Sequence, residues 1–206
     1  MRNKFVLLAV AVFIGAFILG CVPTEPLNIG VHIPGGIHKY DKSVSLYFDQ
    51  SLKNAILKRS PTAKYSTFGD TLASEIEGII NHYFQNVKVV TTRSIGNSDF
   101  LMVFSIQQDT CDVGVGFGAY AQTKTTDWWC RLFGKFEVLD ASDLVLFMAT
   151  MEGDKHCHDR YSELDIKTFQ HFKIIKQNGI CAVEGAVNSF LSEIVSNIEE
   201  NAVFQK

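Results

Sequence analysis

Residues 99–106 read DFLMVFSI, and this short stretch decides the fold. Apolar side chains occupy odd and even positions alike, so neither face of an extended chain would be polar here. Strands that are covered on both faces have this pattern, whereas strands with one solvated face alternate apolar and polar residues. We therefore predict a buried central strand, against which the other elements must pack.

The segment before this strand predicts a helix, from Phe68 to Phe84. Its apolar residues recur at the three- and four-residue spacing of a core-facing helical stripe; they are Leu72, Ile76, Ile79, Ile80, Tyr83 and Phe84. Ser66 or Thr67 can cap the helix, and Asp70 lies in the first turn, where the helix dipole favours an acid. Strands are predicted on either side, at 43–48 and 87–91.

The segments after the central strand predict more strands and a final helix. Residues 113–123 alternate, and the runs 133–139 and 144–151 flank the polar turn Asp140–Asp143, as in a β-hairpin. A last helical stripe comprises Val183, Val187, Phe190, Leu191, Ile194 and Ile198. Residues 153–180 have a weaker pattern, with helix expected around 161–175.

This order of elements predicts an α+β fold. One strand and one helix are followed by a run of strands and a second long helix. Such an order favours helices segregated to one face of a sheet. We expect a largely antiparallel sheet of about five or six strands, with two main helices packed on one face.

The N-terminus predicts export and lipidation. Arg2 and Lys4 precede an apolar run that ends at Leu19, which is the arrangement of a signal peptide over residues 1–20. The ending Ile18-Leu19-Gly20-Cys21 resembles the bacterial lipobox, and this resemblance implies that Cys21 becomes the lipidated first residue. Since Val22 is not Asp, the resemblance implies the outer membrane, with the protein facing the periplasm.

The mature chain is predicted to have two parts. Residues 21–43 are rich in proline and glycine and predict the lipidated cysteine followed by a flexible tether or extended arm, with a reach of about 70 Å if fully stretched. Residues 44–206 would form a single periplasmic domain. Loss of Arg2 and Lys4 leaves 17 basic against 22 acidic residues, near −5. Without a basic stripe, nucleic acid is not an expected partner.

Four cysteines remain after Cys21. They are Cys111, Cys130, Cys157 and Cys181, and an even number in an oxidising compartment predicts two disulfides, with three possible connectivities. We favour the neighbour pairs 111–130 and 157–181, because each closes a short loop.

No constellation of residues predicts catalysis, a cofactor or a metal. The cluster His156-Cys157-His158-Asp159 has suitable metal ligands, but neighbouring side chains in an extended run point to opposite faces, and a disulfide would remove Cys157. A cysteine nucleophile would need an unpaired thiol. We expect no enzyme, no cofactor and no metal site.

Two sets of residues are candidates for an interface. Trp128 and Trp129 are adjacent, so in a strand one ring would face inward and the other outward, where a tryptophan can anchor a partner. Gly114, Gly116 and Gly118 would share one side of a strand and permit the close approach of a helix or of another chain.

Over residues 43–151 and the last helix, the chain resembles the periplasmic accessory lipoproteins of envelope transport machines. These include the lipopolysaccharide-assembly lipoprotein and the auxiliary lipoproteins of lipid-transporting ABC systems; the resemblance rests on SVSLYFDQSLKNAILKR, FGDTLASEIEGIINHYFQNVKVV, DFLMVFSI and FEVLDASDLVLF. It implies a non-catalytic accessory or assembly subunit that binds an outer-membrane or periplasmic protein complex. A lipid- or small-ligand-binding shuttle and a homo-oligomeric ring are the alternatives.

Overall fold

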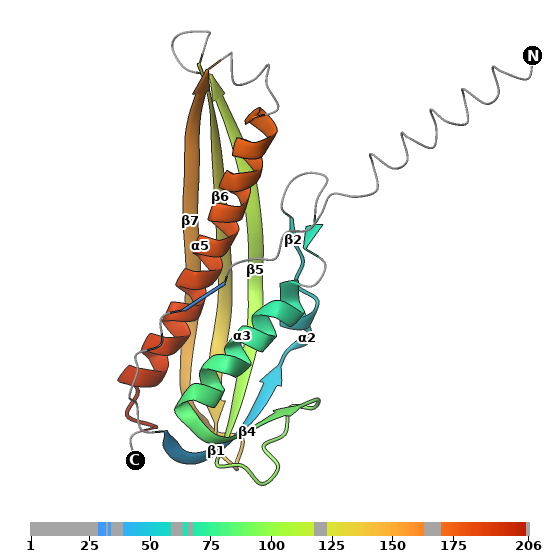
Figure 1. Ribbon diagram of the computed structural model, residues 1–206. Coiled ribbons are helices and arrows are strands. Elements are labelled where there is room, and N and C mark those ends of the chain that lie inside the picture. Colours follow the sequence, from blue (N-terminus) through green and yellow to red (C-terminus); the bar gives the residue numbers. More distant parts are fainter. Residues whose placement is uncertain are drawn as a thin grey trace, which may run out of the picture.

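Seven strands and three helices make up the part of the chain that the computed structural model describes, which is residues 29–31, 33, 39–58, 64–65, 68–117, 123–162 and 170–204 (Figure 1). In chain order the elements are β1 (Tyr40–Phe48), α2 (Gln50–Lys53), β2 (Leu57–Lys58), β3 (Lys64–Tyr65), α3 (Phe68–Tyr83), β4 (Phe84–Val90), β5 (Phe100–Phe117), β6 (Thr123–Leu139), β7 (Val145–Ser162) and α5 (Gln170–Glu200).

Five of the strands form one mixed sheet in the order β4-β1-β5-β6-β7. β1 runs parallel to both of its neighbours, while β5, β6 and β7 are antiparallel to one another. These last three strands have 18, 17 and 18 residues and extend well beyond the others as a long ribbon (Figure 1). The predicted α+β fold with a mostly antiparallel sheet is confirmed. β2 and β3 form a separate small hairpin.

The two main helices, α3 and α5, pack on one face of this sheet, as predicted. The stripe predicted on α3 is buried there, with Leu72, Ile76 and Ile80 fully covered. Phe190 and Ile194 of α5 are equally buried and belong to the same core cluster. The sheet contributes aromatic rings from neighbouring strands; Phe104 of β5 and Phe136 of β6 stack with 4.6 Å between their ring centroids. We call this side the helix face and the other side the open face.

The predicted central strand is confirmed. Phe100, Met102, Phe104 and Ile106 point to the helix face and join the main core, whereas Leu101 and Val103 are buried on the open face. The loop between β4 and β5 lies against this part of the open face, since Ile95 packs on the cluster formed by Leu101, Val103 and Leu139. Ser45 of β1 is buried beneath the loop and donates its hydroxyl to the carbonyl of Ile95 at 2.7 Å.

Three sequence expectations are corrected by the fold. The helix expected around residues 161–175 is wrong at its start, because β7 continues to Ser162, and α5 begins at Gln170, well before the stripe predicted from Val183. β1 begins at Tyr40, inside the segment assigned to the tether. The hairpin turn Asp140–Asp143 is where the sequence predicts it, and the Asp140 carboxylate accepts from the backbone N–H groups of Ser142 and Leu144 at 2.7 and 3.0 Å.

Candidate functional site

The cysteines fasten α5 to the ribbon. Cys157 of β7 forms a disulfide with Cys181 of α5, which is one of the two neighbour pairs favoured by the sequence. Cys130 of β6 is also disulfide-bonded, and its partner in the strand register of β5 is Cys111. Because disulfide sulfurs are neither nucleophiles nor metal ligands, these bonded cysteines serve structure.

Successive side chains of β7 point to opposite faces of the sheet, so the adjacent residues His156 and Cys157 of the predicted cluster do not lie together. Cys157 is buried on the helix face in its disulfide, whereas His156 is exposed and approaches Asp154, with 4.0 Å between Nε2 and Oδ1. No group of three or more metal-ligating side chains comes together among the residues that the structure describes. The side chains of His158 and Asp159 lie outside those described.

The two tryptophans lie on opposite faces of β6. Trp128 is 5% exposed and belongs to the main core, and its indole nitrogen has no hydrogen-bond partner among the described residues. Trp129 is partly exposed on the open face, where its register neighbours are Asp112 of β5 and His156 of β7. Of the pair, only Trp129 is placed to contact a partner.

The glycines predicted to share one side of a strand lie near the C-terminal end of β5, where it pairs with the start of β6. Gly114 is opposite Asp127 and Gly116 is opposite Thr125, while Gly118 lies outside the described residues. Close approach between α5 and the sheet is seen instead at Gly134, Gly153 and Gly185, which no pattern in the sequence singled out.

At these three glycines α5 approaches the ribbon too closely for a side chain. A Cβ on Gly153 would collide with the carbonyl oxygen of Ala186 and lie 2.9 Å from the backbone nitrogen of Phe190. A Cβ on Gly134 would lie 2.8 Å from the Phe190 ring. From α5, a Cβ on Gly185 would lie 2.8 Å from Cδ of Lys155. The helix and the sheet are therefore in direct contact along this seam.

Ion pairs occupy the middle of the open face. Arg131 lies between two acids of β7, with contacts of 3.1 Å to Glu152 and 3.3 Å to Asp154. Glu137 accepts from Lys135 at 2.7 Å and from Arg93 at 3.1 Å. Ion pairs at the surface, such as those of Arg131, add little stability, typically about 0–1 kcal/mol each. They leave this face polar but close to neutral.

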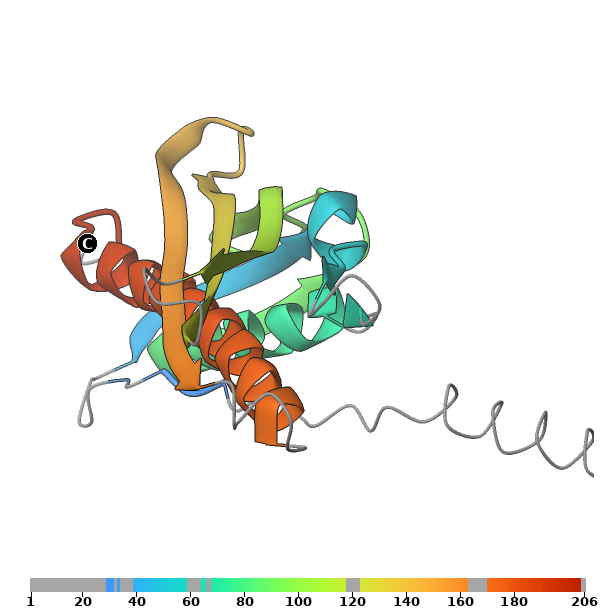
Figure 2. The same cartoon turned by 90° about the horizontal axis from the view of Figure 1, so that it is seen from above.

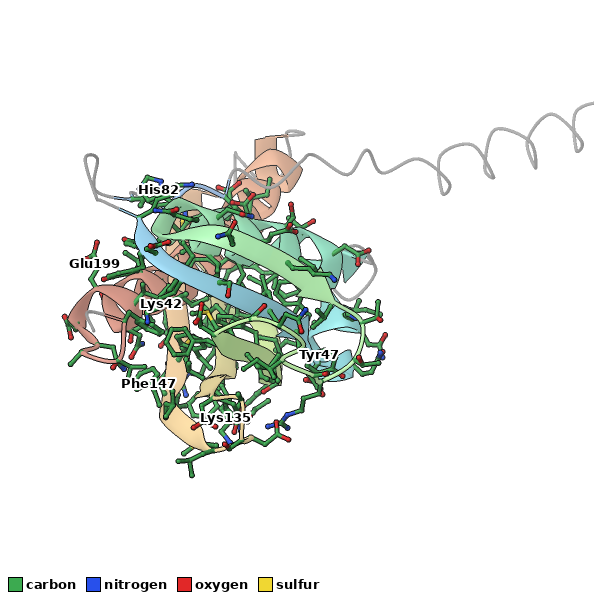
Figure 3. The ribbon with its side chains drawn as sticks, turned by 90° about the horizontal axis from the view of Figure 1, so that it is seen from below. Lys42, Tyr47, His82, Lys135, Phe147 and Glu199 are labelled. Atoms are coloured by element: carbon green, nitrogen blue, oxygen red, sulfur yellow. A yellow bond between two sulfur atoms is a disulfide. The ribbon has the colours of Figure 1, made fainter. Side chains whose placement is uncertain are left out.

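Below the ion pairs, the end of the β6–β7 hairpin is apolar and exposed. Leu144 is 62% exposed, Met148 56%, Val145 45% and Leu146 37%. The hairpin projects from the body on the side away from α5 (Figure 2). Figure 3 looks onto this end of the molecule, with Lys135 of β6 and Phe147 of β7 labelled. The signal in the sequence was the run VLFM, which is apolar at consecutive positions directly after a turn.

The segment before β1 is attached to the body rather than free. Ile29, Val31 and Ile33 pack against the main core. The backbone N–H of Gly30 donates to Oδ1 of Asn188 in α5 at 3.2 Å. The tether predicted over residues 21–43 is thus docked at its described positions, and Cys21 with the rest of residues 1–28 lies outside the described part.

Three described side chains have a shifted pKa, and each of them makes hydrogen bonds that hold the fold together. Hydrogen bonds from the backbone N–H and the hydroxyl of Ser43, both 2.7 Å, hold the pKa of the Asp99 carboxyl below its usual range. The Ser51 backbone N–H lowers the pKa of Asp49, which caps α2. Burial, together with a 2.7 Å bond to Glu199, raises the pKa of the Tyr83 phenol. These three groups lie in separate parts of the fold and do not form one site.

None of the described helices is both long enough and apolar enough to span a membrane. The geometry defines a class: an α+β domain with one helix-covered sheet face, one open face and an apolar projecting hairpin. No family model and no curated protein matches the sequence.

Comparison with solved structures finds one with the same fold and others that are more loosely similar. A Helicobacter pylori protein described as a neuraminyllactose-binding hemagglutinin homologue superposes with a TM-score of 0.51 at 9% identity, over 85% of this chain and 93% of that one. A minor lipoprotein of Acinetobacter baumannii matches with a TM-score of 0.40 at 14% identity, over 78% of this chain and 92% of that one. The first similarity shows that the architecture occurs in another protein, and at such low identity it concerns the fold alone.

Proposed function

We propose that this chain is a non-catalytic lipoprotein of the bacterial outer membrane, anchored through Cys21, that serves as an accessory or assembly subunit of a transport or export complex in the cell envelope. The observation that carries this proposal is the docked segment at residues 29–33. With Cys21 in the membrane, seven residues, 22–28, separate the anchor from the first docked position, Ile29. Seven residues and their flanking bonds reach about 28 Å at most.

A reach this short favours a partner at the membrane. The fully extended arm of residues 21–43 would have carried the domain about 70 Å away. With the docked arm, the domain stays within about 28 Å of the anchor. This arrangement suits a subunit of a membrane-embedded assembly better than a shuttle that must leave the membrane.

The contact between α5 and the ribbon also disfavours a lipid or ligand shuttle. A shuttle needs an apolar cavity between its layers. At Gly153 the backbone of α5 lies against the sheet, and at Gly134 the ring of Phe190 does. A ligand could enter there only by separating α5 from β7, which the Cys157–Cys181 disulfide opposes.

The open face of the ribbon offers the surface for a protein partner. Trp129 is partly exposed there, and Phe133 lies four residues further along the same face of β6. Arg131 stands between them and is held by its two acids. Tryptophan and arginine are among the types most enriched in the energetic centres of interfaces.

The experiment that tests the proposal is purification of the lipidated protein from its native envelope in mild detergent, followed by mass spectrometry of the proteins that accompany it. A Cys21→Ala variant is the control for anchoring, and a Trp129→Ala variant is the test of the surface. We expect a stoichiometric membrane protein that is lost with Cys21→Ala and reduced with Trp129→Ala. Recovery of the wild-type protein with no other protein would refute an accessory role.

A further inference from the structure

The last residues of the β6–β7 hairpin, 144–148, present aliphatic side chains to the solvent, and we call them the hairpin end. They belong to the run LVLFMAT at residues 144–150, which carries no charge. Within it, Leu144, Val145, Leu146 and Met148 are 62%, 45%, 37% and 56% exposed. Single exposed apolar residues are ordinary, whereas a contiguous group of them marks a surface that contacts a protein or a membrane.

The pairing of β7 with β6 is irregular in the middle of the hairpin end. Val145 lies opposite Leu139. The next pair is Phe147 with Val138, so Leu146 is an extra residue on β7 in this register. A bulge of this kind breaks the alternation of side chains and blunts an edge against pairing with another strand. The hairpin end is therefore poorly suited to accept a strand from a second chain.

Apolar side chains project from both sides of the hairpin end. Val145 and Met148 point to the open face, because they lie opposite Leu139 and Glu137 of that face. Phe147 points to the helix face and is only half-buried. A protein surface would cover one of these sides, whereas the boundary between the headgroups and the acyl chains of a bilayer can surround both.

The docked arm keeps the hairpin end within reach of the membrane. Gly30 is bonded to Asn188, which lies in the turn of α5 whose backbone meets Gly153 of β7. From residue 153 to residue 145 the strand advances by eight residues, or about 26 Å. The arm between the predicted anchor and Ile29 reaches about 28 Å. The anchor and the hairpin end can thus lie at the same membrane surface.

We propose that the hairpin end is a second membrane contact, at which Leu144, Leu146 and Met148 enter the apolar boundary of the bilayer that holds the anchor. The contact is shallow, because charges and unpaired strand backbone are costly in hydrocarbon. Asp140 and Asp143 of the turn, together with the edge of β7, therefore stay among the headgroups. The Asp140 carboxylate already accepts two backbone N–H groups of its own turn.

A second contact gives the domain a fixed orientation on the membrane, which a single arm does not. Once the anchor is inserted, the hairpin end binds at the high effective concentration of a tethered group. A few aliphatic side chains are then sufficient, although alone they would bind weakly. The inference rests on the proposed anchor at Cys21, but it does not require the accessory role.

Quenching by lipid-borne probes tests the contact. The full-length lipidated Met148→Cys chain is labelled with a fluorophore and placed in vesicles of phosphatidylethanolamine and phosphatidylglycerol, a fraction of which carry a nitroxide on an acyl chain. Val89→Cys, at a similarly exposed position on the opposite edge of the sheet, is the matched control. Wild type, treated in parallel, gives the background. Because a buried apolar surface lies at the acyl-chain boundary, we expect quenching at least about threefold stronger at position 148 than at 89.

A charge in the hairpin end provides the second arm of the test. Leu146→Asp, added to the labelled Met148→Cys chain, should lower the quenching to the level of the Val89 label, whereas Val89→Asp should leave it unchanged. Equal quenching at positions 148 and 89 would overturn the inference and leave the hairpin end to a protein partner. Strong quenching that survives Leu146→Asp would also overturn it.

The failures of the two proposals remain distinguishable. A lipidated chain that does not float with the vesicles would overturn the membrane contact together with the anchor. Equal quenching in a chain that does float would overturn the contact alone. Neither quenching result would contradict the accessory role, which is judged by the membrane protein that accompanies the chain.

Discussion

The backbone N–H of Gly30 is hydrogen-bonded to the side-chain oxygen of Asn188, 158 residues later in the chain, at 3.2 Å. This bond joins the segment that leads from the predicted anchor to the middle of the longest helix. The apolar residues on either side, Ile29 and Val31, add contacts with the core. These contacts make residues 29–31 and 33 part of the domain surface.

Removal of the Asn188 side chain should loosen this segment. In Asn188→Ala the Gly30 N–H loses its partner, at a cost of about 1 kcal/mol, which corresponds to a roughly fivefold larger undocked fraction. We expect cleavage by a non-specific protease before β1 to accelerate by about that factor. Ser192→Ala is the matched control, because Ser192 lies one turn further along α5 and donates only within the helix, to the carbonyl of Asn188. Equal cleavage of wild type and Asn188→Ala would mean that the bond does not hold the segment.

A methyl group at Gly153 should be costly. In Gly153→Ala the new Cβ meets the Ala186 carbonyl and the Phe190 backbone, which cannot move without shifting α5. Overpacking of this kind costs about 1–3 kcal/mol. Gly78→Ala is the control, since Gly78 lies in α3 with nothing within 4 Å of its Cβ position, and alanine there should stabilise by about 0.5–1 kcal/mol. Urea unfolding measures the free energy of unfolding of both variants, which should fall for Gly153→Ala and rise for Gly78→Ala. An unchanged free energy of unfolding for Gly153→Ala would contradict the close contact.

Much of the fold could be predicted because local patterns and tertiary burial agree. The stripe on α3 and the two-sided apolar run of β5 are signals of burial, and both segments are buried. The turn at residues 140–143 was predictable because Asp140 can bond its own backbone. In these segments the sequence pattern depends only on residues close together in the chain.

The far half of the ribbon could not be predicted, because its stability depends on partners distant in sequence. Residues 152–160 of β7 are charged and resemble a loop, yet they pair with β6 along their length. The first turns of α5 were predicted in part, since helix was expected around residues 161–175 and α5 begins at Gln170. The two tryptophans could be predicted only in part. The sequence showed that Trp128 and Trp129 would point to opposite faces of β6, but it did not show which ring would be buried under α5.

Acid should weaken the joint between β1 and β5. The Asp99 carboxylate accepts two bonds from Ser43, and its pKa in the folded protein is lowered, first by the backbone N–H and then by the hydroxyl. Because the pKa of this carboxyl is lower in the folded than in the unfolded protein, its full stabilising effect is present at any pH above its pKa in the unfolded chain, near 3.8. The stabilisation is lost as the pH falls through the pKa of the carboxyl in the folded protein. Asp99→Asn should be less stable than wild type at pH 7, and the difference should shrink below pH 4.

Urea unfolding of wild type, Asp99→Asn and Ser43→Ala at pH 7 and at pH 3 checks this expectation. Ser43→Ala keeps the backbone donor and removes the hydroxyl, so its loss at pH 7 should be the smaller of the two. A constant difference between Asp99→Asn and wild type at both pH values would show that the ionised carboxylate adds nothing to the fold.

Loss of the Cys157–Cys181 disulfide should release the first half of α5 from the ribbon. The bond closes a loop with a sequence separation of 24, for which the chain-entropy relation gives about 3.5 kcal/mol. A Cys157→Ala, Cys181→Ala double variant should lose about that much stability, with faster amide exchange in the first half of α5 than near Glu199, which is also bonded to Tyr83 of α3. Peptide mapping of the oxidised wild-type protein should recover 157–181 and, as the strand register predicts, 111–130. A free thiol among these four cysteines would contradict the pairing and reopen the hypothesis of a cysteine nucleophile.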